Sequence, residues 1–336
     1  MDSRSSRASR KLAIAVAALL SGLFLAPAWS APALTPAGTT AGFSLSMFAN
    51  EFPITASPCC GPLGIAFPTT GGVMVSDYPG NVRVFPTDAD GQSAASIVPG
   101  GFYGSGNGVG LAVTGGVVYM TEQALGSVIQ LNNDGSLNQL IVSGIPTATG
   151  IVANPANGHL FVSDCCSGSG IWDVDPIAKT KTQFKTSGTF DGLTITSDGS
   201  ILYAETGGQI VGYSTSDGSQ VFASGGIPGG PDGTALGFGS LGGLIFVNTN
   251  DGNLFQVDLT TLVQTDLVTG GTRGDFVTAD PNGTLLFTQT SDIWRLAPPA
   301  GGCIGNECTT VPEPATLALL GIGLAGLGFS RRKRTR

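Results

Sequence analysis

The stretch Pro62-Leu63-Gly64-Ile65-Ala66 and its continuation Val73-Met74-Val75-Ser76-Asp77 set a pattern that the rest of the chain repeats. A glycine opens a short apolar strand, a turn with two glycines follows, and a second apolar strand ends on an acid. Five later segments start in the same way, at Gly110, Gly150, Gly192, Gly233 and Gly274. The intervals between successive starts are 46, 40, 42, 41 and 41 residues. A period of about 40–50 residues with several short strands per repeat is typical of β-propeller blades.

Each repeat continues with a third strand, and the first five also have a more polar outer strand. The sixth repeat stops after Leu296 without one. The segment 43–48 alternates apolar and polar residues, which suits a half-exposed edge strand. Pairing it outside residues 293–296 would complete the sixth sheet and leave no gap between the first and last blades. The sequence therefore predicts an all-β, six-bladed propeller over residues 42–297, closed by an N-terminal strand. A β-solenoid or a pair of β-sandwiches is the alternative.

The composition agrees with an all-β chain. It contains 52 glycines, and only 11% of its residues are charged. Segments with helical periodicity are almost missing, and Asp-Gly or Asn-Gly dipeptides separate the apolar runs. Such dipeptides supply the positive φ angles that tight hairpins need.

Both ends of the chain have the layout of targeting segments. Residues 1–30 combine basic residues, an apolar run and small residues, which predicts a secretory signal peptide. Residues 31–41 and the cysteine-containing segment 298–310 are rich in Pro, Ala, Thr and Gly, and we predict that they are linkers. Residues 311–336 consist of a short polar motif, an apolar run over 315–329 and a basic end. A retained membrane anchor is one interpretation of this tail.

The motif Val311, Pro312, Glu313 and Pro314, with the apolar run and basic end behind it, resembles the PEP-CTERM sorting signal. The resemblance implies export across the inner membrane of a Gram-negative bacterium and processing by an exosortase. It also implies a place at the cell surface or in the extracellular matrix, with at least transient anchoring in the membrane through the C-terminal helix.

The charge of the chain argues against one class of partner. The formal net charge is −8 over the whole chain. Without residues 1–30 and the basic end 331–336, six Lys and Arg remain against 22 acids, which leaves about −16. An acidic field of this size repels nucleic acid, so we expect no nucleic-acid partner.

The first repeat also resembles the blades of NHL and gluconolactonase-like propellers, whose blades read roughly Pro-x-Gly-Ile-Ala and end the second strand on Ala-Asp. Residues 62–66 and the ending Val75-Ser76-Asp77 carry the likeness, and Val162-Ser163-Asp164 repeats the ending. The resemblance implies a divalent metal held by Glu, Asn and Asp side chains in the central funnel. By loop position Asn107, Asp191 and Asp232 match this set, but no acid stands at the start of the first blade.

Propeller geometry places two sets of oxygen-bearing side chains on one face. The starts of the innermost strands and the ends of the second strands point the same way, because the two strands are antiparallel. Hard oxygen ligands without His or Cys suit Ca²⁺, so a calcium site is one hypothesis, and turn-forming or turn-bracing residues are the alternative. The predicted metal ligands are Asn107, Asp191, Asp232 and Asp275, and the predicted ligand-face acids are Asp77, Glu122, Asp164 and Glu205.

The six cysteines fall in three pairs, and export favours disulfides. They are Cys59, Cys60, Cys165, Cys166, Cys303 and Cys308. Cys303 and Cys308 most simply close their own small loop. The two adjacent pairs could each form a vicinal disulfide or could cross-link to each other, and the sequence does not choose.

No catalytic residues are predicted. The one histidine, His159, stands beside an Asn-Gly turn, and there is no G-x-S-x-G motif to support a serine triad. We therefore expect a surface propeller that binds a ligand such as an exopolysaccharide or a surface protein. A metal-dependent, lactonase-like hydrolase and a structural scaffold of a biofilm matrix are the alternatives.

Overall fold

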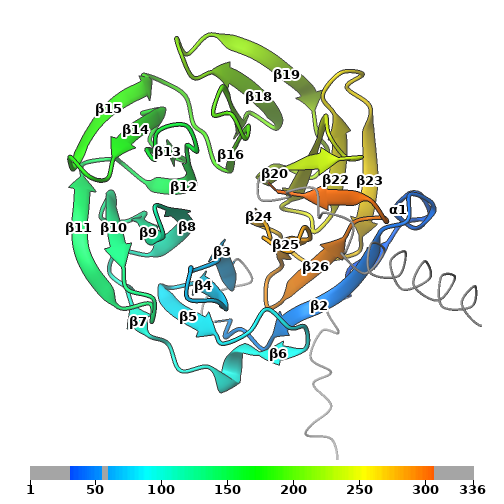
Figure 1. The fold of residues 1–336 in the computed structure, drawn as a ribbon, viewed down its shortest axis with the longest axis horizontal. Helices are drawn as coiled ribbons and strands as arrows, with labels where there is room; N and C mark the ends of the chain where they lie inside the picture. The colour runs from blue at the N-terminus through cyan, green and yellow to red at the C-terminus, as the bar shows by residue number, and fades with distance from the viewer. Residues whose placement is uncertain (1–30, 55–59, 306–336) are drawn as a thin grey trace, which may run out of the picture. The chain divides into compact units, whose positions relative to one another are not determined.

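A computed structural model describes residues 31–54 and 60–305, and over these ranges the chain forms an all-β, six-bladed propeller. Six sheets stand around a common axis, with one short strand of each sheet nearest the centre (Figure 1). The predictions for residues 1–30 and 311–336, and for Cys59 and Cys308, lie outside the described residues. Within the described ranges no helix is long and apolar enough to cross a membrane.

Each blade is an antiparallel meander that runs outward from the axis. Blades 1 to 3 consist of β3 (Pro62–Ala66), β4 (Val73–Asp77), β5 (Asn81–Phe85) and β7 (Gly101–Phe102); β8 (Gly108–Thr114), β9 (Val117–Glu122), β10 (Ser127–Leu131) and β11 (Leu137–Ser143); and β12 (Ala148–Ala153), β13 (Leu160–Asp164), β14 (Ile171–Asp175) and β15 (Thr180–Lys185). Blades 4 to 6 consist of β16 (Leu193–Ile195), β17 (Ile201–Thr206), β18 (Gln209–Ser214) and β19 (Gln220–Gly226); β20 (Pro231–Gly239), β21 (Leu244–Thr249), β22 (Leu254–Asp258) and β23 (Gln264–Thr269); and β24 (Val277–Ala279), β25 (Leu285–Thr288), β26 (Ile293–Ala297) and β2 (Ser44–Asn50).

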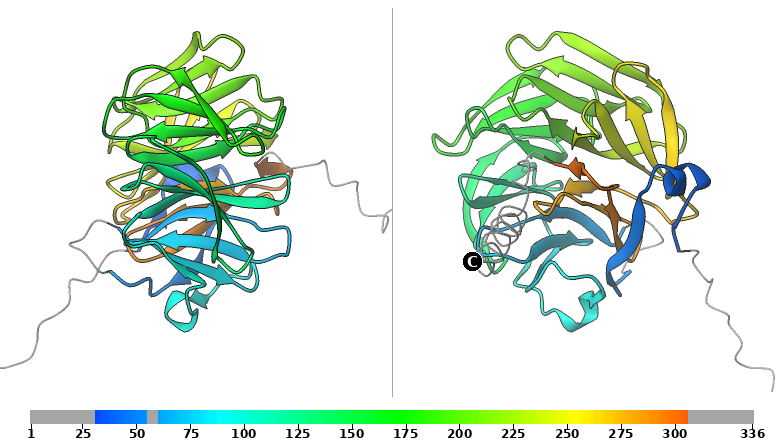
Figure 2. Two further views of the ribbon diagram at one scale, coloured as in Figure 1. Left: turned by 90° about the vertical axis from the view of Figure 1, so that its left-hand side faces the viewer. Right: turned by 45° about the vertical axis from the view of Figure 1, so that its right-hand side comes forward.

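The hydrophobic core is divided among the junctions between blades. Six clusters of buried side chains each contain residues of two adjacent blades. Between blades 1 and 2, for example, Met74 packs with Met120 and Val118. Since a strand buried on both sides must be apolar on both, the inner strands read as continuous apolar runs. The stacking of neighbouring sheets is visible from the side (Figure 2).

The N-terminal strand closes the ring as predicted. β2 pairs antiparallel with β26, from Ser44 opposite Ala297 to Ala49 opposite Ile293. This pairing supplies the fourth strand of blade 6 from the opposite end of the described chain. Closure leaves no exposed strand edge between the last blade and the first.

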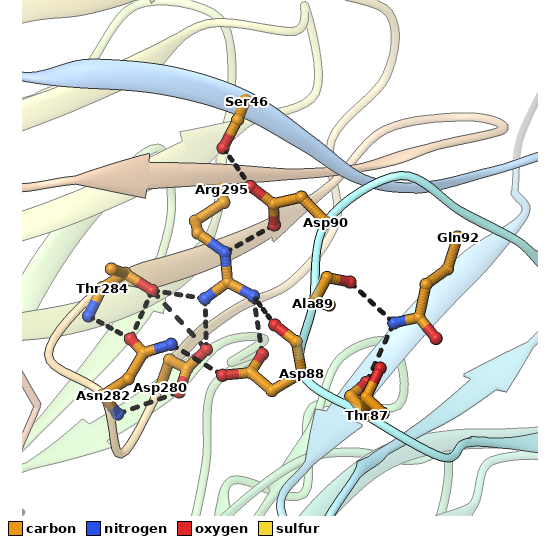
Figure 3. Close-up of polar contacts among 10 residues, drawn as sticks. All are labelled: Ser46, Thr87, Asp88, Ala89, Asp90, Gln92, Asp280, Asn282, Thr284 and Arg295. Carbon is orange, nitrogen blue, oxygen red and sulfur yellow. Dashed lines mark hydrogen bonds and ion pairs between the residues drawn. The ribbon is translucent and has the colours of Figure 1, made fainter.

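Arg295 on β26 reinforces the closure with three carboxylates (Figure 3). Its guanidinium lies 2.6 Å from Asp88, 2.8 Å from Asp90 and 2.5 Å from Asp280. Asp90 also accepts a hydrogen bond from Ser46 of β2. The segment after β5 therefore reaches back to blade 6, where the short strand β6 (Gln92–Ser93) pairs parallel with β2. For this reason the outer strand of blade 1, β7, has only two residues.

The predicted linkers are in part built into blade 5, which corrects that interpretation. β1 (Ala33–Leu34) pairs outside β23, and the short helix α1 (Pro36–Thr40) follows it. Thr35 caps this helix by accepting from Gly38 N and donating to the Asp266 carbonyl. At the other end β27 (Gly302–Ile304) pairs with β20, and Ile304 is fully buried. Small Pro- and Gly-rich segments resemble spacers in composition, but here their backbones find open strand edges.

Candidate functional site

The six innermost strands approach one another closely near the axis, and small residues permit this. A Cβ atom on Gly64 would lie 2.3 Å from the Val109 carbonyl oxygen of the next blade, and one on Gly150 would lie 2.2 Å from that of Asp191. Hydroxyl groups join the same points. Ser163, for example, accepts from Gly150 N at 2.8 Å and donates to the Asp191 carbonyl at 2.7 Å.

These contacts define which residues are equivalent in the six blades. In blade 6 the backbone N–H that reaches the second-strand hydroxyl belongs to Phe276, which donates to Thr288 at 2.9 Å. Phe276 is therefore the counterpart of Gly64, and the predicted start at Gly274 is displaced by two residues. The residue before each of these six positions forms what we call the start ring: Leu63, Val109, Thr149, Asp191, Asp232 and Asp275.

The start ring is polarised, which means that one part of it is acidic and another part is apolar. Blades 4, 5 and 6 contribute its three aspartates, whereas blades 1 and 2 contribute Leu63 and Val109. The two apolar members pack with Cys60, Tyr78 and Phe276 in a small cluster of their own. We call the end of the propeller that carries this ring the start face, and the opposite end, with Gly71 and Gly115, the turn face.

Asp232 is the middle member of the three aspartates. Its side chain lies within hydrogen-bonding reach of those of Asp191 and Asp275, whereas Asp191 and Asp275 influence each other through their charges. Arg273 contributes the only positive charge of the group: its Nη2 atom lies 2.7 Å from Asp275 Oδ1 and 3.8 Å from Asp232 Oδ2. Together with Glu205, these residues form the acidic cluster. Oδ1 of Asp191 is buried without a conventional donor among the described residues.

Burial dominates the protonation of the cluster. It raises the pKa of Asp191 to about 8, helped by the charges of Glu205 and Asp275 and opposed by Arg273. Burial, with the Asp191 charge next, also holds the pKa of Asp232 well above its usual range. The pKa of Asp275 is raised by burial although Arg273 opposes it. Burial raises the pKa of Glu205 to about 7, against a hydrogen bond from Gly208 N. At neutral pH the cluster therefore retains protons, and it can give them up or exchange them for a cation.

Asn107 stands apart from the three predicted metal ligands that the fold unites. It lies two residues before Val109, the start-ring residue of its blade, and has a backbone φ of 51°. Its Nδ2 donates to Gln123 Oε1 at 3.0 Å, while its Oδ1 is buried with no hydrogen-bond partner in the part of the chain that the structure describes. Over the described ranges, no three His, Cys, Asp or Glu side chains are placed to hold a metal ion. The donor atoms of the cluster suit calcium by type, but the Arg273 guanidinium already pairs with two of its carboxyls, Asp232 and Asp275.

Three of the predicted ligand-face acids brace turns. Asp77 binds Arg83 at 2.6 Å and Asn81 at 2.5 Å, and Glu122 accepts from Ser127 at 2.5 Å. Asp164 accepts from the backbone N–H groups of residues 166, 167 and 169 and from neighbouring hydroxyls. Although burial acts to raise the pKa of Asp164, these hydrogen bonds hold it well below its usual range. Of the four predicted acids, Glu205 alone joins the acidic cluster.

Adjacent cysteines form a ring on the start face. Cys165 and Cys166 are joined to each other. Gln123, the partner of Asn107, lies 3.4 Å from Cys165 Sγ through its Nε2. Cys60 and Cys303 are also in disulfides. Cys59, and Cys308 as the expected partner of Cys303, lie outside the described residues.

Sequence reasoning missed Arg273 as part of the site, although it is one of only six basic residues between the two ends of the chain. It stands two residues before a start-ring aspartate, which was the available signal. His159 contacts Asp173 at 2.8 Å and Asp175 at 3.7 Å on the outer strands of blade 3, away from the start ring.

The described residues thus form a six-bladed propeller with an acidic cluster at one end of its axis, and several solved structures are similar to it in fold. A gluconolactonase from Xanthomonas campestris has a TM-score of 0.61 at 15% identity, over 80% of this chain and 95% of that one. A Trichoderma reesei carbohydrate-active enzyme of family AA12 has a TM-score of 0.57 at 14% identity, over 82% and 99% of the two chains. A chain of a nidogen/laminin complex has a TM-score of 0.54 at 15% identity, over 67% and 93%. At these identities the similarity shows the fold alone.

Residues 310–333 match the PEP-CTERM protein-sorting motif, which confirms that resemblance. The motif indicates export and surface or membrane-associated sorting in Gram-negative bacteria, with exosortase as the enzyme that recognises it. No curated protein matches the sequence.

Proposed function

We propose that this chain is an exported propeller of the cell surface or extracellular matrix that binds an extracellular ligand through the acidic cluster of its start face. The observation that carries the proposal is the closeness of Asp232 to both Asp191 and Asp275. Three consecutive blades bring carboxyls together, with only Arg273 as a counter-charge, which costs folding free energy. Stability alone would favour apolar residues there, as blades 1 and 2 have in Leu63 and Val109.

The polarised start ring favours a ligand with many hydroxyl groups. Carboxyl groups and the Arg273 guanidinium can accept and donate hydrogen bonds to hydroxyls. The half-buried aromatic side chains of Tyr78 and Phe276 supply an apolar surface beside them. A polysaccharide offers both hydroxyl groups and apolar sugar faces, so an exopolysaccharide of the matrix is the proposed ligand.

Binding of the purified secreted protein to exopolysaccharide tests this function, in calcium and again with a chelator. We expect the double variant Asp232→Asn, Asp275→Asn to lose about tenfold or more in affinity, since charged hydrogen bonds contribute about 1.5–3 kcal/mol each. Asp217→Asn is the matched control, because Asn can keep the turn that Asp217 forms on an exposed loop. Unchanged binding by the double variant would reject the site and favour the scaffold alternative.

A hydrolase that uses the same acidic cluster is the second candidate. It is favoured by the pKa of about 7 for Glu205 and of about 8 for Asp191, since groups that titrate near neutral pH can act as a general acid or base. If it is correct, the protein hydrolyses a sugar lactone, and Glu205→Gln lowers the rate at least about a hundredfold. A rate equal to that of buffer, with and without added calcium, would reject it.

Resident calcium is the third point to test, by metal analysis of the protein purified without refolding. If Arg273 serves in place of a metal, the wild type contains none, and Arg273→Gln gains calcium affinity because three carboxyls lose their counter-charge. Stoichiometric calcium in the wild type would show instead that the cluster accommodates both cations.

A further inference from the structure

A second hollow lies at the other end of the propeller axis. The cavity on the turn face has a volume of about 1040 Å³. Its walls are the last residues of the innermost strands and the turns that follow them, such as Phe67, Ala112 and Ala153. We call it the turn-face cavity. Its size suits a drug-sized molecule, since ligand sites measure about 300–1,000 Å³.

A ring of side chains forms the floor of this cavity. Each blade contributes one residue: Ile65, Leu111, Ile151, Leu193, Thr234 and Val277. Five of the six are aliphatic. Between this ring and the start ring, only a gap of about 30 Å³ remains. The ring therefore separates the turn-face cavity from the acidic cluster, and the two sites are independent.

The walls offer no free positive charge to a ligand. Asp88 and Asp280 are the two charged residues among those that line the cavity. Both are engaged by Arg295, at 2.6 Å and 2.5 Å, and Arg295 also binds Asp90 (Figure 3). An anionic ligand would have to leave water without gaining a counter-charge, which is costly. A neutral, mainly apolar molecule loses little by entering and removes apolar wall from water.

One polar group in the floor has no partner. The side chain of Thr234 is 4% exposed, and its hydroxyl finds no hydrogen bond among the described residues. The hydroxyl oxygen itself has almost no exposed surface, so a ligand in the cavity reaches it after the side chain rotates about χ1. Because an unsatisfied buried hydroxyl costs about 1–3 kcal/mol, pairing with a ligand is favourable. Threonine also differs from the other five members of the ring in having a hydroxyl at all.

We propose that the turn-face cavity binds a neutral, largely apolar small molecule that carries one hydrogen-bonding group directed at Thr234. The aliphatic ring and walls hold the body of the molecule, and the Thr234 hydroxyl fixes its inner end. This site faces away from the acidic cluster and does not depend on the function proposed for that cluster.

The test is a titration of the purified chain with N-phenyl-1-naphthylamine, a neutral fluorescent probe with one N–H group. We expect saturable binding that falls at least tenfold in Ala153→Phe and in Thr194→Phe, which fill the cavity from different blades. Val221→Phe, on an exposed outer strand, is the matched control and should bind as the wild type does. Each variant is first checked for an unchanged thermal unfolding midpoint.

A second comparison isolates the hydroxyl. Thr234→Val keeps the shape of the floor and should weaken the N–H probe several-fold while leaving a hydrocarbon of similar shape unaffected. An anionic anilinonaphthalene sulfonate should bind at least tenfold more weakly than the neutral probe. The proposal is overturned if no saturable binding occurs, if both filling variants bind normally, or if Val221→Phe loses as much as they do.

Discussion

At the scale of single residues, the position nearest the axis decides both packing and chemistry. A Cβ on Gly192 would lie 1.9 Å from the Asp232 carbonyl oxygen, so glycine lets neighbouring strands meet. The side chain just before that position is thereby forced toward the axis with its counterparts. Where the six residues are apolar they pack, as Leu63 and Val109 do, and where they are acidic they retain protons.

The raised pKa of Asp191 predicts a stability that falls with pH. Its folded pKa of about 8 lies above the ordinary 3.8, so the folded chain holds this proton more tightly than the unfolded chain does. The free energy of unfolding should therefore decrease as the pH rises from about 4 to about 8. In Asp191→Asn, urea unfolding across this range should show a smaller decrease. Parallel curves for the variant and the wild type would show that Asp191 does not titrate in this window.

At the scale of the strands, hydroxyl groups at the ends of second strands connect neighbouring blades. Ser76, Thr121 and Ser163 each accept from a glycine N–H of their own blade and donate to a carbonyl of the next. Blades 4 and 5 have Glu205 and Asn248 at this position. The first three blades are thus each connected to the next by a repeated hydroxyl hydrogen bond, and Asn248 Nδ2 donates to the Phe276 carbonyl of the next blade at 3.3 Å.

Removing one of these hydroxyls should loosen a junction between blades. Ser163→Ala leaves the Gly150 N–H and the Asp191 carbonyl without this partner in a buried place, at a cost of about 1–3 kcal/mol. Ser187→Ala, at an exposed site, should change stability by less than about 0.5 kcal/mol. Equal denaturation midpoints for the two variants would contradict the role of Ser163.

At the scale of the whole molecule, closure by β2 brings residues from opposite ends of the described chain together. The same closure brings Asp88, Asp90 and Asp280 around Arg295, which is 7% exposed as a side chain. One arginine therefore connects the closing blade, the first blade and the rim of the turn-face cavity. Loss of this residue affects all three.

Replacing Arg295 should open the ring. Arg295→Met leaves the buried Asp280 and the partly exposed Asp88 and Asp90 without their counter-charge, which costs about 3–5 kcal/mol of stability. Limited proteolysis should then cut first at the junction of blades 1 and 6, in the segment 86–100. Arg295→Lys keeps the charge but offers fewer directed donors, so an intermediate effect is expected. A variant Arg295→Met that unfolds at the wild-type midpoint would show that β2 closes the ring without this contact.

The sequence by itself determined the number of blades, the closing strand and the sorting motif. Each of these depends on a local period or a contiguous segment, so it survives small errors of alignment. It also placed Asp191, Asp232 and Asp275 on one face. The tertiary structure alone decided that Asp232 approaches the other two, that Arg273 joins them and that Asn107 does not. The reason is that contact across blades depends on strand register to a single residue, as Phe276 in place of Gly274 shows. The cavity at the other end also appeared only in three dimensions, because its walls come from six separate repeats and its rim acids are engaged by Arg295.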